Sequence, residues 1–81
     1  MQVRVVPFAR LRELLGAATL ERDEPEGVTA GELWARLARD FPSLAELERS
    51  TRFVRNGAFV DRRAVLRDGD ELGLLPPYGG G

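Results

Sequence analysis

The chain opens with alternating hydrophobic and polar residues. Val3 and Val5 alternate with Gln2 and Arg4, a period of two that predicts a half-buried β-strand. Pro7 has no backbone N–H to donate to a neighbouring strand. The first strand is therefore expected to end at Pro7 or to lie at a sheet edge there.

The spacing of hydrophobic residues then becomes helical. Three leucines at helical spacing predict a short helix: Leu11, Leu14 and Leu15. Gly16 is placed to end this helix. A weaker strand is expected at residues 18–22. The acidic residues 23–27, which include Pro and Gly, predict a turn.

The clearest helix in the sequence follows this turn. Thr29 and Glu32 have the spacing of a capping box, and Val28 and Leu33 have that of a hydrophobic staple. We interpret the apolar face of this helix, Trp34 included, as core rather than as a ligand site. That face comprises Leu33, Trp34, Leu37, Ala38 and Phe41.

The pattern after this helix predicts one more helical turn and then β-structure. Pro42 discourages the helix from continuing, and Ser43 and Glu46 repeat the capping-box spacing. Two short apolar-rich runs, 53–55 and 58–60, flank Asn56-Gly57, the strongest short-range signal for a β-hairpin.

The order of the predicted elements indicates the fold class. A turn at 68–70 precedes a final strand that contains Leu72 and Leu74. Strand, short helix, strand, helix, hairpin and strand together predict an α+β fold, with one main helix on a mixed sheet. We expect one domain at residues 1–75 and a flexible C-terminal tail at 76–81, since 81 residues suit a single domain.

The residue types that are missing narrow the possible chemistry. The chain has no Cys and no His, so it lacks a thiolate, a Cys-built metal site and the commonest general base. All 12 basic residues are Arg, and the net charge of −1 provides no general field to attract nucleic acid. The sequence shows no membrane-spanning run and no signal-peptide pattern. We expect a cytoplasmic chain with no bound cofactor or metal, no nucleic-acid or membrane partner, and no stand-alone enzymatic activity.

Two charged clusters have alternative interpretations. Asp68, Asp70 and Glu71 suggest a calcium loop, but the twelve-residue ligand spacing of such a loop is absent, and a turn explains them better. A group of Arg residues near the hairpin suggests phosphate or RNA binding, with Phe53 and Phe59 as stacking platforms. Against this, acidic residues cancel the charge, and a hairpin is expected to bury both rings. The group comprises Arg49, Arg52, Arg55, Arg62 and Arg63.

The last six residues form the remaining candidate for chemistry. They are Pro76, Pro77, Tyr78, Gly79, Gly80 and Gly81. Glycine lets a backbone pass close to the walls of a channel, and two prolines favour an extended entry. A terminal carboxylate becomes reactive once ATP has adenylated it, but the chain has no phosphate-cradling motif for that step. A reactive terminus would therefore need a partner enzyme, while the alternative is a frayed end.

Three segments of the chain match the pattern of a known family. Residues 7–14 (PFARLREL) resemble a segment FFAxxREL, and residues 56–57 and 66–81 (LRDGDELGLLPPYGGG) resemble segments VNG and LxDGDEVxxxPPxxGG. These segments are typical of the small subunit of molybdopterin synthase. They lie in the right order and spacing, so the resemblance covers essentially the whole chain.

The resemblance implies a ubiquitin-like β-grasp fold and a role for the tail. A ubiquitin-activating-type enzyme would use ATP to adenylate Gly81, and a sulfur donor protein would convert it to a thiocarboxylate. The sulfur would then pass to cyclic pyranopterin monophosphate in the large synthase subunit, within a heterotetramer. Gly80 and Gly81 would be the reactive di-glycine. The insertion channel would hold Pro76, Pro77, Tyr78 and Gly79.

The chain departs from the family pattern at several positions, which leaves related functions open. Pro7 replaces a Phe, and Gly73 stands where Ala or a similar residue is usual. Tyr78 and Gly79 precede the di-glycine, where a small hydrophobic residue and then Ser or Thr are usual. The alternatives are a sulfur carrier for thiamine synthesis or tRNA thiolation, and a ubiquitin-like protein modifier. The expected docking residues, each with an alternative interpretation as core, are Phe8, Phe59 and Leu75.

Overall fold

Five strands form one mixed sheet in a computed structural model that describes residues 1–76. The strand order is β2-β1-β5-β3-β4, and β1 and β5 pair in parallel while every other neighbouring pair is antiparallel. The bounds are β1 Gln2–Pro7, β2 Leu20–Asp23, β3 Arg52–Arg55, β4 Ala58–Val60 and β5 Glu71–Leu75. The predicted α+β class with a mixed sheet is confirmed.

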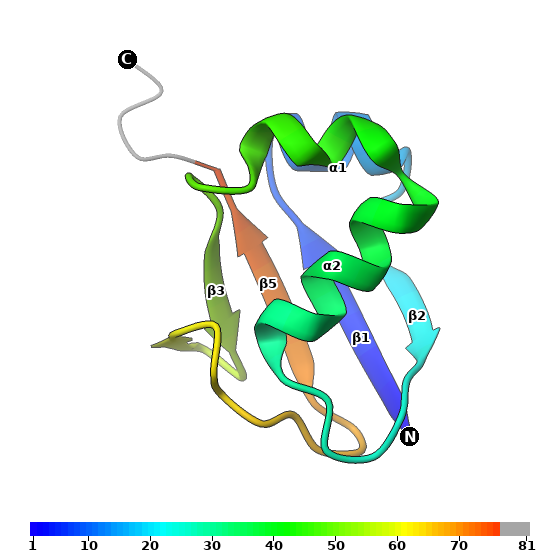
Figure 1. Ribbon diagram of the computed structural model, residues 1–81, viewed down its shortest axis with the longest axis vertical. Coiled ribbons are helices and arrows are strands. Elements are labelled where there is room, and N and C mark those ends of the chain that lie inside the picture. The colour runs from blue at the N-terminus through cyan, green and yellow to red at the C-terminus, as the bar shows by residue number, and fades with distance from the viewer. Residues whose placement is uncertain (77–81) are drawn as a thin grey trace.

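Three helical segments lie between the strands. Helix α1 (Arg10–Leu15) ends at Gly16, whose left-handed φ of 71° suits a residue without a side chain. Helix α2 (Ala30–Asp40) lies across one face of the sheet (Figure 1), and the 3₁₀ helix η1 (Pro42–Leu47) follows it. The hairpin prediction is confirmed, with Asn56 and Gly57 both at positive φ between β3 and β4.

Two local predictions need correction. The weak strand begins at Leu20 rather than at residue 18. The second capping box is absent: Pro42 occupies a first position of η1, so the cap residue is Phe41, whose side chain accepts no hydrogen bond. Glu46 lies instead 3.8 Å from the guanidinium of Arg10. The first strand ends at Pro7 as predicted, in the interior of the sheet.

The core lies between α2 and the sheet, as the apolar face predicted. Trp34 is fully buried and packs edge to face on Phe53, with ring centroids 6.3 Å apart. Its indole N–H donates to Glu48 at 2.9 Å, so the one polar atom of this side chain is satisfied. The other core residues on α2, β1 and β5 are Ala30, Leu33, Leu37, Val3, Val5, Leu72 and Leu74.

A buried carboxylate joins the edge of the sheet to α2. The Glu24 side chain accepts hydrogen bonds from Arg22 and Arg36, and Arg22 also donates to Asp40. Burial opposes the charge of Arg22, but its hydrogen bonds to Asp40 and Glu24 outweigh this and raise its pKa. The charges of Glu24 and Arg22 are therefore both compensated, which is the condition under which burial of a carboxylate is tolerated.

The first turn of α2 is held by its own cap and by the loop after β4. Thr29 accepts from the backbone of Glu32, whose carboxylate accepts from the backbone of Thr29, so the predicted capping box is confirmed. The next donors, the N–H groups of Ala30 and Gly31, bond to the carbonyls of Ala64 and Arg62 at 2.9 Å. The loop therefore supplies acceptors that a helix start otherwise lacks.

The contact between this loop and the start of α2 predicts an unusual effect of Gly31→Ala. Helix propensity alone favours Ala over Gly by about 1 kcal/mol. A Cβ at Gly31, however, would lie 3.1 Å from both the Cβ and the carbonyl oxygen of Arg62, and the Gly31 N–H holds that carbonyl in place. We expect Gly31→Ala to lower the free energy of unfolding by about 1 kcal/mol, measured by urea denaturation.

A matched variant calibrates this expectation. Ala35→Gly changes an exposed position of the same helix and should lower stability by about 1 kcal/mol through propensity alone. A Gly31→Ala protein that is more stable than the parent would show that the loop yields, contrary to the docking described above.

Candidate functional site

The parallel pairing of β1 with β5 brings Phe8 to the point where the tail leaves the sheet. Pro7 pairs with Leu74, and the Phe8 N–H donates to the Leu74 carbonyl at 3.0 Å. Leu75 and Pro76 follow, both half-buried, and Pro76 is the last described residue. The expected tail positions Pro77, Tyr78, Gly79, Gly80 and Gly81 lie outside the described residues, so their predicted roles and the domain boundary stay predictions.

The face of the sheet opposite α2 carries an apolar row beside this point. Val6, Gly73, Val54 and Phe59 are register partners across β1, β5, β3 and β4. Their strand neighbours belong to the core on the α2 side, so the alternation of side chains places this row on the other face. We call this row, together with Phe8, the open face.

The absence of a side chain at Gly73 shapes the open face. A Cβ at Gly73 would lie 3.5 Å from Cε2 of Phe8 and 3.4 Å from Cβ of Val54. The ring of Phe8 therefore lies close over the Gly73 backbone and remains 40% exposed. Across the row, Phe59 is 65% exposed. The two aromatic rings thus offer apolar surface on the same side of the sheet.

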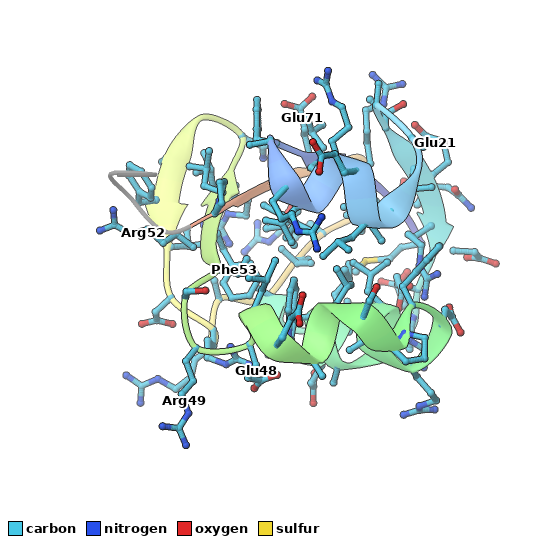
Figure 2. The ribbon with its side chains drawn as sticks, turned by 90° about the horizontal axis from the view of Figure 1, so that it is seen from above. Glu21, Glu48, Arg49, Arg52, Phe53 and Glu71 are labelled. Atoms are coloured by element: carbon cyan, nitrogen blue, oxygen red, sulfur yellow. The ribbon has the colours of Figure 1, made fainter. Side chains whose placement is uncertain are left out.

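The other half of this sheet face is polar. Arg4 donates to Glu21 at 2.7 Å across β1 and β2, and this hydrogen bond and the charge of Glu21 raise the pKa of Arg4. Glu71 is the partner of Arg4 on the other side. Figure 2 shows Glu21 and Glu71 on the side of the sheet away from α2. The apolar half is therefore the half that adjoins the tail.

The structure decides between the alternative interpretations of the aromatic residues. Phe53 is 3% exposed and belongs to the core, which confirms the expectation that the hairpin buries this ring. The expectation that the hairpin also buries Phe59 is wrong. Phe53 pairs with Val60, and the adjacent residue on β4, Phe59, faces the opposite side of the sheet. Phe59 also lies on β4, an edge strand. Phe53 and Phe59 therefore do not form a pair of stacking platforms.

Val6 and Val54 belong to the open face but were not singled out from the sequence. Both are half-buried. The alternation that places Val3 and Val5 in the core also places Val6 on the opposite face, so the signal was present. The pairing that brings Val6 and Val54 to either side of Gly73 had no local signal.

The acidic turn is explained by its own hydrogen bonds. Asp70 accepts from the Asn56 amide and from the backbone of Arg67, and Asp68 accepts from the backbone of Gln2. Among residues 1–76 no group of three His, Cys, Asp or Glu side chains has the arrangement of a metal site. The interpretation as turn residues is confirmed for Asp68 and Asp70, whereas Glu71 is the first residue of β5. No helix in the same part of the chain is long and apolar enough to cross a membrane.

Comparisons with known proteins agree with the family resemblance in the sequence. The model of the ThiS family matches residues 5–81. The molybdopterin synthase sulfur carrier subunit of Arabidopsis thaliana is 33% identical over 81 residues, which is 100% of this chain and 84% of that protein. Its counterpart in Homo sapiens is 31% identical, over 99% of this chain and 94% of that protein.

Solved structures agree on the fold. A putative molybdopterin converting factor subunit 1 from Pyrococcus furiosus has a TM-score of 0.86 at 28% identity, covering 95% of this chain and 98% of its own. SAMP1 of Haloferax volcanii has a TM-score of 0.86 at 27% identity, with both chains fully covered. The ubiquitin of Caldiarchaeum subterraneum, at 21% identity and a TM-score of 0.65, shares the fold over 100% of this chain and 98% of its own. The predicted ubiquitin-like β-grasp fold is confirmed.

The contrast between the two hairpin phenylalanines is testable by substitution. Phe53→Ala removes a core ring that contacts Trp34 and should lower the free energy of unfolding by about 3–5 kcal/mol. Phe59→Ala removes an exposed ring and should change it by about 0.5 kcal/mol or less. Urea denaturation followed by Trp34 fluorescence measures both. Equal losses in the two variants would contradict the assignment of Phe59 to the open face.

Proposed function

Because this chain belongs to the ThiS family, we propose that it is a sulfur carrier in molybdopterin biosynthesis, with the sulfur on its C-terminal Gly81. The observation that carries the proposal is the apolar open face. It lies beside the start of the tail, where the backbone N–H of Phe8 donates a hydrogen bond to the carbonyl of Leu74. The proposal is supported by the end-to-end similarity to molybdopterin synthase sulfur carrier subunits.

The chemistry proceeds in two steps on the terminal carboxyl group. In the first, the Gly81 carboxylate attacks the α-phosphate of ATP held by a ubiquitin-activating-type partner, and pyrophosphate leaves. In the second, hydrosulfide released by a donor protein attacks the acyl carbon, the bond between that carbon and the AMP oxygen breaks, and the products are AMP and a thiocarboxylate. The whole sequence contains no Cys or His, so this chain is the co-substrate and its partners supply the catalytic groups.

The loaded terminus then delivers its sulfur in a second complex. The large subunit of molybdopterin synthase receives the tail, and Gly80 and Gly81 reach its active site. The sulfur bonds to cyclic pyranopterin monophosphate, and water hydrolyses the acyl–sulfur bond, which restores the Gly81 carboxylate. Pro76, Pro77, Tyr78 and Gly79 lie along the channel. Glycines suit this path because they have no side chain to collide with its walls.

The open face is the docking surface for these partners. Exposed apolar patches that adjoin a functional segment typically mark interaction sites. Phe8 and Phe59 provide large rings, and Leu75 connects the surface to the tail. Aromatic residues in such positions commonly contribute most of the binding free energy.

The proposal predicts a mass change at the C-terminus. Incubation with the adenylating enzyme, ATP and a sulfur donor should raise the intact mass by about 16 Da, because one oxygen is replaced by sulfur. Deletion of Gly81 should abolish the gain without changing the urea-denaturation midpoint, since every core residue in the described part of the chain lies at or before Leu74. An unchanged mass with an adenylating enzyme that loads its known carrier would rule the proposal out.

The same assay tests the docking surface. Phe59→Ala should slow the mass gain at least tenfold, as expected for the loss of a buried aromatic anchor at an interface. Glu21→Ala alters the polar half of the same sheet face and serves as the control. A Phe59→Ala protein that loads at the parental rate would exclude the open face from docking.

A second candidate function is protein modification. SAMP1 of Haloferax volcanii, a small archaeal modifier protein, matches this chain over its full length. In that function the activated Gly81 would form isopeptide bonds with lysines of target proteins. Conjugates of higher mass that disappear on deletion of Gly81 would favour it. Rescue of a thiamine or tRNA-thiolation defect, without rescue of a molybdenum-cofactor defect, would favour the related sulfur carriers.

A further inference from the structure

The near-neutral net charge conceals a strongly basic segment. Residues 49–67 contain six Arg and one acidic residue, whereas the rest of the chain contains six Arg and twelve acidic residues. The basic segment comprises β3, β4 and the loop that follows them, and it ends before the acidic turn at 68–70. The hairpin side of the sheet therefore differs in charge from the rest of the molecule.

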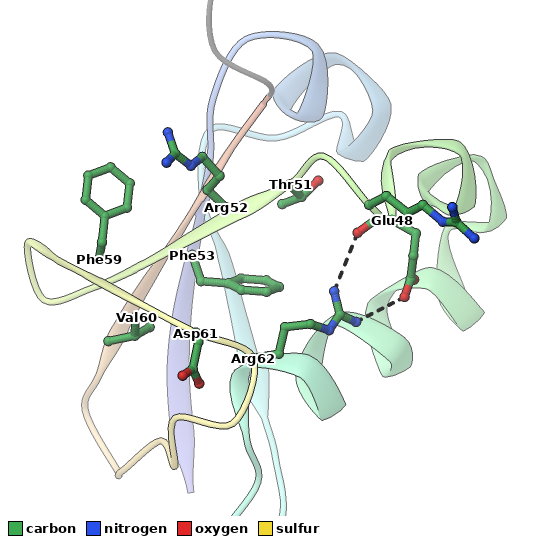
Figure 3. A pocket seen from close by; sticks show the side chains of 9 residues that line it. Glu48, Thr51, Arg52, Phe53, Phe59, Val60, Asp61 and Arg62 are labelled. Carbon is green, nitrogen blue, oxygen red and sulfur yellow. Dashed lines mark hydrogen bonds and ion pairs between the residues drawn. The ribbon is translucent and has the colours of Figure 1, made fainter.

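A groove of about 550 Å³ lies within this segment, between the end of η1 and the hairpin. On one side of it, Arg62 lies over the ring of Phe53, with its guanidinium carbon 5.7 Å from the ring centroid. The Arg62 guanidinium also donates to the Glu48 carboxylate at 3.1 Å and to the Glu48 carbonyl at 3.5 Å (Figure 3). The charge of Arg62 is thus already compensated within the fold.

Two other arginines that line the groove are not compensated in this way. Among residues 1–76, no carboxylate lies within 4 Å of the guanidinium of Arg49 or of Arg52. Both side chains are exposed. Arg52 stacks over Phe59 at 5.3 Å, an interaction that leaves its N–H donors available to a ligand. The groove therefore offers two uncompensated guanidinium groups beside an aromatic ring.

The position of Arg52 connects the groove to the tail. Arg52 is the register partner of Leu75, the last residue of β5. Its neighbour Phe59 belongs to the open face. A protein that takes up the tail and covers Phe59 must therefore pass close to Arg49 and Arg52.

We propose that this groove binds an acidic segment, with Asp or Glu side chains, of the protein that receives the tail. The inference rests on the proposed function. Guanidinium groups pair with carboxylates in bidentate geometry, and the two groups available here match such a partner in charge. Charges at the rim of an interface act mainly on the association rate, so the groove directs the approach of the tail to its acceptor.

The groove fits a protein carboxylate better than it fits RNA. One aromatic ring, Phe53, is buried beneath Arg62, and Arg52 already occupies the ring of Phe59, so no pair of open stacking platforms exists here. Glu48 and Asp61 also line the groove and would repel a polyphosphate backbone. Separate acidic side chains can contact Arg49 and Arg52 while avoiding both carboxylates.

The test compares two double charge reversals in binding to the cognate large subunit of molybdopterin synthase. Arg49→Glu/Arg52→Glu alters the groove, and Arg12→Glu/Arg39→Glu makes the same change in net charge on exposed positions of α1 and α2. We expect the groove variant to associate about tenfold more slowly at low ionic strength, and the control variant less than about twofold. The difference should largely vanish near 1 M salt, where the Debye length is about 3 Å.

Each other outcome would overturn the inference. Equal slowing of both variants would mean that net charge alone matters, and an unchanged rate in the groove variant would show that the groove is not used. The groove would be reassigned to RNA if the parent and control proteins bound a single-stranded RNA oligonucleotide, the groove variant did not, and the groove variant still bound the large subunit normally. Failure of the parent chain to bind the large subunit would overturn the proposed function itself, a result distinguishable from failure of the groove variant alone.

Discussion

The parallel hydrogen bonding between β1 and β5 is the constraint on which the rest of the structure depends. It joins the first strand of the chain to the last at the centre of the sheet and sets Pro7 opposite Leu74. Because both strands are central, their inward residues become the middle of the core beneath α2. The same register carries Phe8 to the root of the tail. The core and the candidate site are therefore two consequences of one pairing.

Two surfaces of different character meet at the end of this central pair. The open face provides apolar area through Phe8 and Phe59, and the groove provides positive charge through Arg49 and Arg52. Arg52 belongs to both regions, since it stacks on Phe59 and pairs in register with Leu75. In the docking that we propose, apolar burial provides affinity, and the charge of the arginines raises the association rate.

Elements with a local signal were predicted well, and those that depend on distant contacts were not. The capping box at Thr29 and Glu32 and the Asn56-Gly57 hairpin formed as expected, because both signals act within a few residues. The second capping box failed, since Pro42 moved the start of η1 upstream of Ser43. Of the hairpin phenylalanines, Phe53 is buried as the hairpin pattern predicted, whereas Phe59 is exposed, which contradicts its interpretation as core and agrees with the exposure expected of a docking residue. Its exposure follows from the edge position of β4, which a single strand pattern does not reveal.

The sequence by itself determined the order of the elements, the residues that form the core of α2, and the family whose motifs frame the chain. These follow from periodicity and from short segments that carry their own chemistry. Tertiary structure alone decided that Phe8 lies over Gly73, that the loop after β4 supplies acceptors to Gly31, and that Arg52 lies at the root of the tail. Each of these contacts joins residues more than twenty positions apart. No local pattern encodes them, because they exist only once segments distant in the sequence have packed together.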